Sequence, residues 1–324
     1  MLTLVLRRFL ISIPLLLIAT FLVFWMVRST QAFDPTARLA QSRDPSVVQN
    51  ERERLGLDDP IPVQYGRWLK DAVTGDLGES QTKHEEVTSM LQRSFWNTLQ
   101  LILWGALFSA VVAMIIGVYS AVKQYSIGDY VFTSLTYIGI AMPPFVFGLL
   151  AIAYLAVWPK QTWGLDKPPL EFVGLHTTGQ SGLNWDYIKH LVLPVLTLTV
   201  QIVASWTRYQ RAATLDVLSS DYVRTARAKG VPRRKVIIKH AVRNSLIPLV
   251  TVMAVDIGLL FGGLLITEQI FSIPGMGRLF LNALQTGDAP VILGYILVAG
   301  VFVVLFNLIA DVMYGVLDPR VRLS

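Results

Sequence analysis

Few residues of this chain have the types and spacing that catalysis or metal binding requires. The 324 residues include no cysteine, which excludes disulfides, thiolate nucleophiles and cysteine-bound metals. The closest approach to a phosphate-binding P-loop is GLHTTGQS at 174–181, which has Gln180 where the lysine belongs. No nucleophile elbow or His-Glu-x-x-His spacing occurs. The histidines lie far apart in the sequence: His84, His176, His190 and His240. We therefore predict a chain that is not an enzyme and has no catalytic residue, metal site or cofactor of its own.

One carboxylate lies in the middle of an apolar stretch. Asp256 falls within SLIPLVTVMAVDIGLLFGGLLI, where a charged side chain costs about 2.5 to 3.5 kcal/mol to insert into a bilayer. It must therefore face protein or water. Two interpretations remain equally open: it lines a translocation pathway, or it is hydrogen-bonded at an interface with a second membrane subunit. Gln201 and Thr197 are given the same two interpretations.

The elements that position these residues are long apolar segments. Hydrophobic residues make up 53% of the chain and charged residues only 15%, against about 25% charged in soluble domains. A bilayer core is crossed by about 20 helical residues. The sequence predicts an all-α polytopic membrane protein with about six transmembrane helices, near 9–27, 97–122, 130–158, 190–207, 245–266 and 290–315. The first segment is long enough to be an uncleaved anchor, although a cleaved signal peptide is an alternative.

Charge predicts the orientation. The six spans divide the polar segments into two sets, one for each side of the membrane. The set that includes both termini and the loop 208–243 holds 15 Lys and Arg against four Asp. The other set, 28–96 with 159–189 and 267–289, holds 13 Lys and Arg against 16 Asp and Glu. Nine of those 13 lie in the long segment 28–96, where the positive-inside rule is weak. We therefore expect a cytoplasmic (inner) membrane protein with both termini and the basic loop in the cytoplasm.

Three parts follow from this topology. We expect an N-terminal transmembrane helix (1–28), a small helical extracytoplasmic domain (29–96), and a five-helix transmembrane core (97–324) that includes the basic cytoplasmic loop 208–244. The extracytoplasmic domain either gates the pathway or receives a partner, or it is a lid that only joins two spans. The prolines Pro143, Pro144 and Pro194 are expected to kink the third and fourth spans.

The basic loop contains a short helix with unusual side chains. Ser219, Ser220 and Asp221 offer N-cap side chains, and Gly230 suits a left-handed residue that ends a helix, so we predict a helix at 221–229. Pro232 suits the first turn of a second helix with a positive surface toward lipid headgroups. In the first helix, small residues alternate with cations beside an aromatic residue. Such a face favours docking into a groove of another protein.

These motifs resemble those of a known family. DYVRTARAKG followed by HAVRNSLIPL is similar to the signature loop of ABC importer permeases. LGLDDPIPVQYGRWL with GDLGES, ITEQIFSIPGMGRLF, and NLIADVMYGVLDPRVR resemble the first permease subunit of oligopeptide and dipeptide importers, in the peptide/nickel branch. The chain departs from the general pattern in having Arg224-Thr225-Ala226 where many permeases have Glu-Ala-Ala.

The resemblance implies a type I ABC importer permease that moves peptides, with a second homologous permease, two cytoplasmic ATPases that bind ATP and Mg, and an extracytoplasmic peptide-binding protein as partners, and no nucleic acid. It implies a coupling helix at 221–230. The residues expected to contact the ATPase are Tyr222, Val223, Thr225, Ala226, Arg227, Ala228, Lys229 and Gly230. Those expected at the outer mouth, in contact with the binding protein, are Glu268, Pro274, Gly275 and Gly277.

Two other function classes remain. A stand-alone secondary transporter or channel usually carries several intramembrane ionisable residues and inverted repeats with broken helices. This sequence shows one central carboxylate and no obvious repeat. A membrane scaffold without transport would bind partners through the loop but carry no substrate.

Overall fold

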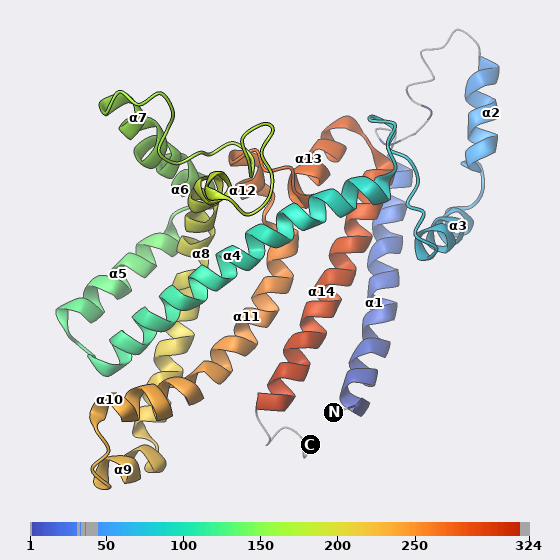
Figure 1. Ribbon diagram of the computed structural model, residues 1–324. Coiled ribbons are helices and arrows are strands. Elements are labelled where there is room, and N and C mark those ends of the chain that lie inside the picture. The colour runs from blue at the N-terminus through green and yellow to red at the C-terminus, as the bar shows by residue number, and fades with distance from the viewer. Residues whose placement is uncertain (1, 31–32, 34–35, 37–44, 318–324) are drawn as a thin grey trace.

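The structure is a computed structural model that describes residues 2–30, 33, 36 and 45–317. The described residues form helices joined by turns, without a β-strand (Figure 1). The helices are α1 (Leu2–Ser29), α2 (Pro45–Leu55), α3 (Ile61–Val73), α4 (Val87–Val122), α5 (Ile127–Ala141), α6 (Pro144–Ala151), the π-helix η3 (Ile152–Val157), α7 (Trp158–Thr162), α8 (Trp185–Ser219), α9 (Asp221–Ala228), α10 (Arg233–Lys235), the π-helix η4 (Val236–Val242), α11 (Arg243–Gly263), α12 (Leu265–Ile270), α13 (Met276–Thr286) and α14 (Ala289–Leu317).

Six helical segments are long and apolar enough to cross a membrane. The all-α polytopic prediction is thus confirmed. The segments run up and down between two ends of the molecule (Figure 1). We call one the α9 end, which holds α9, α10, the start of α1 and the end of α14 (Figure 1). The other, which we call the α13 end, holds α2, α3, α7, α12 and α13 (Figure 1).

The third expected span, 130–158, is wrong as a single helix. Helix α5 ends at Ala141, and α6 begins at Pro144 after an extended residue, Met142, with φ −85° and ψ 123°. The cause is the Pro143-Pro144 pair, because a residue that precedes proline is disfavoured in the α conformation. The expected kink is therefore a complete break. At Pro194, by contrast, α8 continues as one helix.

The helices extend well beyond the predicted spans, and this shortens the basic loop. Helix α8 runs to Ser219, and a continuous helical segment runs from Arg233 to Phe261 through η4. Most of the expected loop 208–244 therefore consists of two helix ends, with α9 between them. Helix α4 likewise begins at Val87, inside the region assigned to the extracytoplasmic domain.

Close helix packing holds the core together. An added Cβ at Gly117 in α4 would lie 2.7 Å from the Gln210 Cβ in α8. The same test at Gly258 in α11 gives 2.9 Å to the Phe306 Cβ in α14. Small residues let helices approach in lipid, where van der Waals contact replaces the hydrophobic effect as the driving force.

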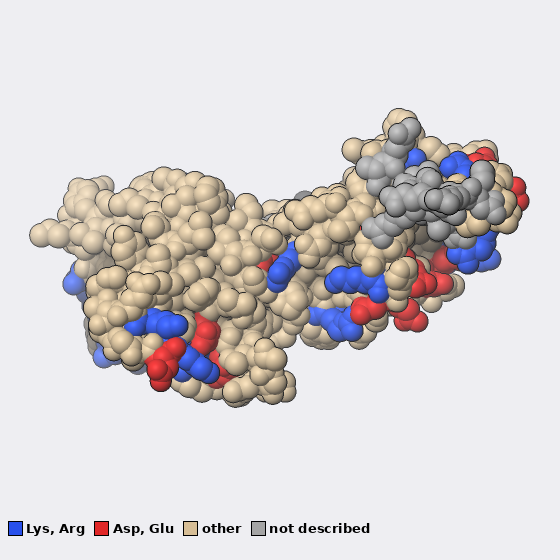
Figure 2. Space-filling view, turned by 90° about the horizontal axis from the view of Figure 1, so that it is seen from above, with Lys and Arg blue, Asp and Glu red and all other residues tan. Residues whose placement is uncertain are grey.

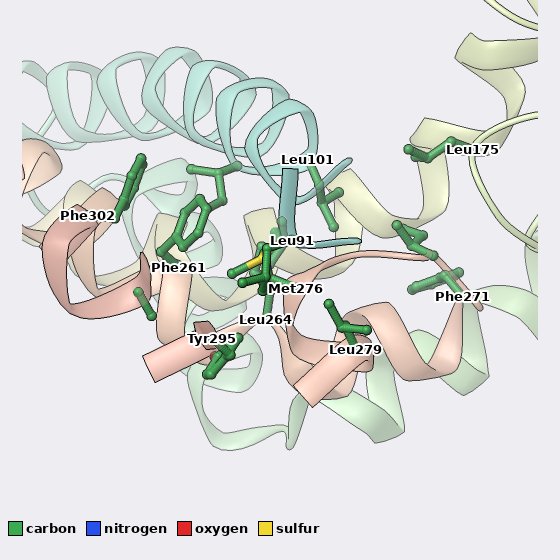
Figure 3. Close-up of a cluster of buried hydrophobic side chains, with 14 of the residues drawn as sticks. Leu91, Leu101, Leu175, Phe261, Leu264, Phe271, Met276, Leu279, Tyr295 and Phe302 are labelled. Atoms are coloured by element: carbon green, nitrogen blue, oxygen red, sulfur yellow. The ribbon is translucent and has the colours of Figure 1, made fainter. Parts of the chain in front are cut away.

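Aromatic rings fill the space between α4, α11 and α14 near the α13 end. The ring centroids of Phe261 and Phe302 lie 3.8 Å apart, and Phe95 is 5.0 Å from Phe261. Figure 3 shows Phe261 and Phe302 beside one another, and Leu264 and Met276 close to Leu91. This cluster therefore joins the membrane helices to the first residue of α13.

The segment between α1 and α4 is fastened to two membrane helices. Thr20 of α1 and Tyr65 of α3 share a hydrogen bond of 2.8 Å between their hydroxyls. Asp288, buried before α14, accepts hydrogen bonds from the Ser80 hydroxyl (2.6 Å) and the Thr82 hydroxyl (2.7 Å). Figure 2, which looks onto the α13 end, shows basic and acidic side chains intermixed there. This mixed charge contrasts with the basic sequence around α9.

Candidate functional site

Helix α9 forms where the sequence predicts it, within one residue. Its C-terminus is a Schellman motif: Gly230 N–H donates to the Arg227 carbonyl at 3.0 Å and Val231 N–H to the Ala226 carbonyl at 3.2 Å. Gly230 has φ +75°, which glycine adopts without strain. The expected side-chain N-cap is not formed, because the Ser220 hydroxyl donates backward to the Val217 carbonyl at 2.5 Å.

Most of the proposed docking residues are solvent-accessible. Thr225, Arg227, Ala228, Lys229 and Gly230 are exposed, and Ala226 is half-buried. Tyr222 is 45% exposed. Val223, however, is completely buried. Its assignment to the docking face is therefore wrong: Val223 anchors α9 to the rest of the chain.

A hydrogen bond ties α9 to α11, and a buried polar cluster joins α11 to α8. The Asn244 side-chain amide at the start of α11 donates to the Tyr222 hydroxyl at 2.9 Å. Three fully buried residues join α8 to α11. The Gln210 amide donates to the Ser245 hydroxyl at 2.8 Å and to the Thr214 hydroxyl at 3.1 Å. Because α9 contacts both α8 and η4, a force on α9 acts directly on two membrane helices.

An ion pair extends this connection to α5. Arg211 of α8 lies 3.2 Å from a carboxylate oxygen of Asp129, which is nearly completely buried. The same carboxylate accepts the Tyr125 N–H at 3.0 Å, within the α4–α5 turn. No local sequence pattern indicates this pair, since 82 residues separate its members.

The three polar residues predicted within the membrane form hydrogen bonds inside this chain. The indole N–H of Trp206 in α8 donates to Asp256 Oδ2 of α11 at 2.7 Å. Thr197 is fully buried and donates to the Leu193 carbonyl, while the Gln201 amide donates to the Thr197 carbonyl at 3.2 Å. The structure therefore gives Asp256 an intrachain partner, which neither sequence interpretation included. A pathway role for Thr197, Gln201 and Asp256 stays a prediction.

Glu268 lies inside the protein at the α13 end. Its side chain is fully buried and accepts the Thr98 hydroxyl at 2.5 Å and the Arg278 N–H at 2.9 Å. The Thr98 hydroxyl in turn accepts the Met276 N–H at 2.8 Å. The carboxylate thus joins α4 to the N-terminus of α13, where the helix dipole favours a negative group. Burial raises the pKa of Glu268 to about 7 despite these hydrogen bonds.

This geometry changes which of the residues expected at the outer mouth are accessible to a partner. Glu268 is not available to a binding protein, because its carboxylate is buried. Gly275 and Gly277 are also buried, and both are glycine for a packing reason. A Cβ at Gly275 would collide with the Glu268 carboxylate, and one at Gly277 would lie 2.8 Å from the Leu265 Cα. Of the four predicted residues only Pro274 is exposed.

Two histidines that lie apart in the sequence approach one carboxylate in the structure. His176 and His190 place Nδ1 at 3.8 Å and 3.7 Å from Asp186 Oδ2. The Thr177 hydroxyl donates to the other oxygen of Asp186 at 2.6 Å. No group of three or more potential metal ligands occurs in the described part of the chain. These contacts hold the α7–α8 connection on the first turn of α8.

Family models match both parts of the chain. Residues 113–323 match the binding-protein-dependent transport system inner membrane component. Residues 1–104 match the N-terminal region of the membrane component of such systems. Together the two matches leave only a short gap in α4.

Relatives match along almost the full length. The chain is 38% identical over 98% of both chains to the oligopeptide transport system permease protein AppB of Bacillus subtilis. It is 36% identical, with the same coverage, to OppB of Mycobacterium tuberculosis, which bears the same description. It is 35% identical to the dipeptide transport system permease protein DppB of Alkalihalophilus pseudofirmus, over 99% of this chain and 100% of the relative. Among solved structures, an amino acid ABC transporter with histidines matches at a TM-score of 0.48 and 13% identity, covering 72% of this chain and 94% of that chain.

Proposed function

The chain belongs to the family of binding-protein-dependent transport system inner membrane components, and on that premise we propose that it is the permease subunit of an ATP-driven ABC importer of peptides. The peptide assignment is supported by relatives of 35–38% identity whose names specify oligopeptide or dipeptide transport. The chain itself hydrolyses no ATP in this proposal, so energy must reach it from partner subunits.

The observation that carries the proposal is the arrangement of α9. It presents Thr225 and Ala228 outward, with Gly230 exposed just beyond its C-terminus, while Val223 anchors it from behind. The small outward residues let the backbone of another protein come close. Because α9 sits between the ends of α8 and η4, a partner that moves α9 changes how two membrane helices pack. Such a pair of alternative packings is the basis of alternating access.

We propose the following assembly around it. The partners are a second homologous permease, two cytoplasmic ATPase subunits that bind ATP and Mg, and an extracytoplasmic binding protein that delivers peptide. In this scheme the α9 end faces the cytoplasm of an inner membrane and the α13 end faces outward. The supporting observation is charge: the segment from Arg208 to Arg243 contains ten Lys and Arg, and cytoplasmic loops carry such an excess.

Copurification from native membranes tests the proposal. We expect the tagged full-length chain to recover an ATPase and a second six-span chain, and the reconstituted assembly to take up peptide only with ATP and the binding protein. Uptake by the chain alone, driven by an ion gradient without ATP, would instead establish a stand-alone transporter. Recovery of partners without peptide uptake would favour a scaffold.

A further inference from the structure

An apolar groove with a basic margin lies between α4 and η4 at the α9 end. The groove has a volume of about 350 Å³. Its walls are almost entirely hydrocarbon, and its lining residues are Met114, Ile115, Val118, Tyr119, Val122 and Lys123 of α4 and its end, with Ile237 and Val242 of η4. Figure 1 shows the lower end of α4 close to α10, which leads directly into η4. The transport function described above uses none of these residues.

The margin of the groove is positively charged. The Lys123 ammonium lies 5.4 Å from the centroid of the Tyr119 ring, so the lysine stem passes along the groove wall while its charge stays at the surface. Five more exposed cations lie on α10, on η4 and at the first residue of α11: Arg233, Arg234, Lys235, Lys239 and Arg243. Within the described residues, neither these five nor Lys123 makes an ion pair. Their charges therefore have no carboxylate counterion among the described residues.

We propose that this groove binds one anionic phospholipid, with an acyl chain between α4 and η4 and the phosphate at Lys123 and the α10 cations. The groove opens onto an exposed apolar surface, since Ile115 in its wall and Ile238 next to Ile237 are 60% and 57% exposed. A hydrocarbon chain suits its walls. The negative charge of a phospholipid headgroup complements the unpaired cations, and basic pockets between membrane helices are known to bind such headgroups. An apolar helix of another subunit would fill the groove but leave those charges without a counterion.

Lipid retention by the full assembly tests the proposal. The assembly would be purified into nanodiscs of phosphatidylglycerol or phosphatidylcholine with identical acyl chains, and retained lipid measured by native mass spectrometry. We expect preferential retention of phosphatidylglycerol. Lys123→Gln should reduce that retention about fivefold, the effect of one cation near a headgroup. Val118→Trp, which fills the groove, should reduce retention of both lipids.

Lys160→Gln is the matched control, because Lys160 is also exposed but lies on α7 at the opposite end. It should retain phosphatidylglycerol as the parent chain does, and Lys123→Arg should restore retention. Equal retention of the two lipids, or an unchanged preference in Lys123→Gln, would overturn the proposal. So would a photo-crosslinker at position 237 that captures another subunit in place of lipid.

Discussion

The indole N–H of Trp206 points at the Asp256 carboxylate and donates to it across 2.7 Å, joining α8 to α11. Trp206 is completely buried and Asp256 is half-buried. A polar tip on an otherwise apolar ring usually finds a partner when it is buried. The carboxylate therefore has a structural task in this chain, whatever else it contacts in an assembly.

We expect Asp256→Leu to destabilise the chain by about 1 to 3 kcal/mol, because the Trp206 indole N–H would be left buried without an acceptor. Asp256→Asn keeps an acceptor oxygen and should unfold at nearly the parent temperature. Thermal unfolding of the detergent-purified chain measures both. If Asp256→Asn unfolds normally but abolishes peptide uptake, the negative charge acts in the pathway and the structural role is not sufficient.

Replacing Ala228 by arginine should reduce ATP-driven uptake by more than about tenfold, which corresponds to about 1.4 kcal/mol at a docking surface. Ala228 is exposed on α9, so the change places bulk on the proposed ATPase contact without disturbing the fold. Ala226→Arg and Gly230→Asp should act in the same direction. Ala228→Ser is the size-matched control and should transport normally. Normal uptake in all three disruptive variants, with full membrane insertion, would contradict the assignment of α9.

Val223 provides a different prediction because it holds α9 from behind. Val223→Asp buries an unpaired charge and should release α9 from α8 and η4. We expect increased protease cleavage around α9 and loss of copurifying ATPase, with the membrane helices intact. The control is Arg224→Gln, since Arg224 is an exposed neighbour on the same helix. Equal protease resistance in the two variants would show that Val223 is not the anchor.

The pair of Asp129 and Arg211 should transmit movement from α8 to α5. Arg211→Gln removes a hydrogen bond to a charged group, and we expect a loss of about 1.5 to 3 kcal/mol. Asp129→Asn should have a similar effect, and the double variant should cost less than the two single losses added together. A double-mutant cycle on thermal unfolding measures this coupling. Strictly additive losses would mean that the pair is not energetically connected.

The stability of the α13 end should depend on pH through Glu268. Its pKa is raised in the folded chain from 4.5 to about 7, so folding favours the protonated acid. Protonated Glu268 stabilises the folded chain fully below about pH 4.5. This stabilisation is lost as the pH rises to about 7, which lowers the free energy of unfolding by up to about 3 kcal/mol. Unfolding temperatures measured from pH 5 to pH 8 should therefore fall as the pH rises. In Glu268→Gln this part of the decline should disappear, and an unchanged decline would refute the assignment to Glu268.

Local sequence determined the features that depend on neighbouring residues. Apolar length predicted six membrane crossings, and Gly230 predicted the end of α9, because only glycine adopts its φ of +75° at little cost. The Pro143-Pro144 pair also marked its position correctly, although as a break and not a kink. These signals need no information about distant parts of the chain.

Tertiary structure decided which side chains are buried and which partners they have. Nothing near Glu268 in the sequence shows that Thr98, 170 residues away, donates to it. The same holds for Trp206 with Asp256 and for Arg211 with Asp129. The physical reason is that burial and hydrogen bonding depend on how helices pack, whereas hydropathy and turn residues report only on each segment alone. The sequence therefore predicted where α9 is, and the packing of α8 and η4 decided which of its residues face outward.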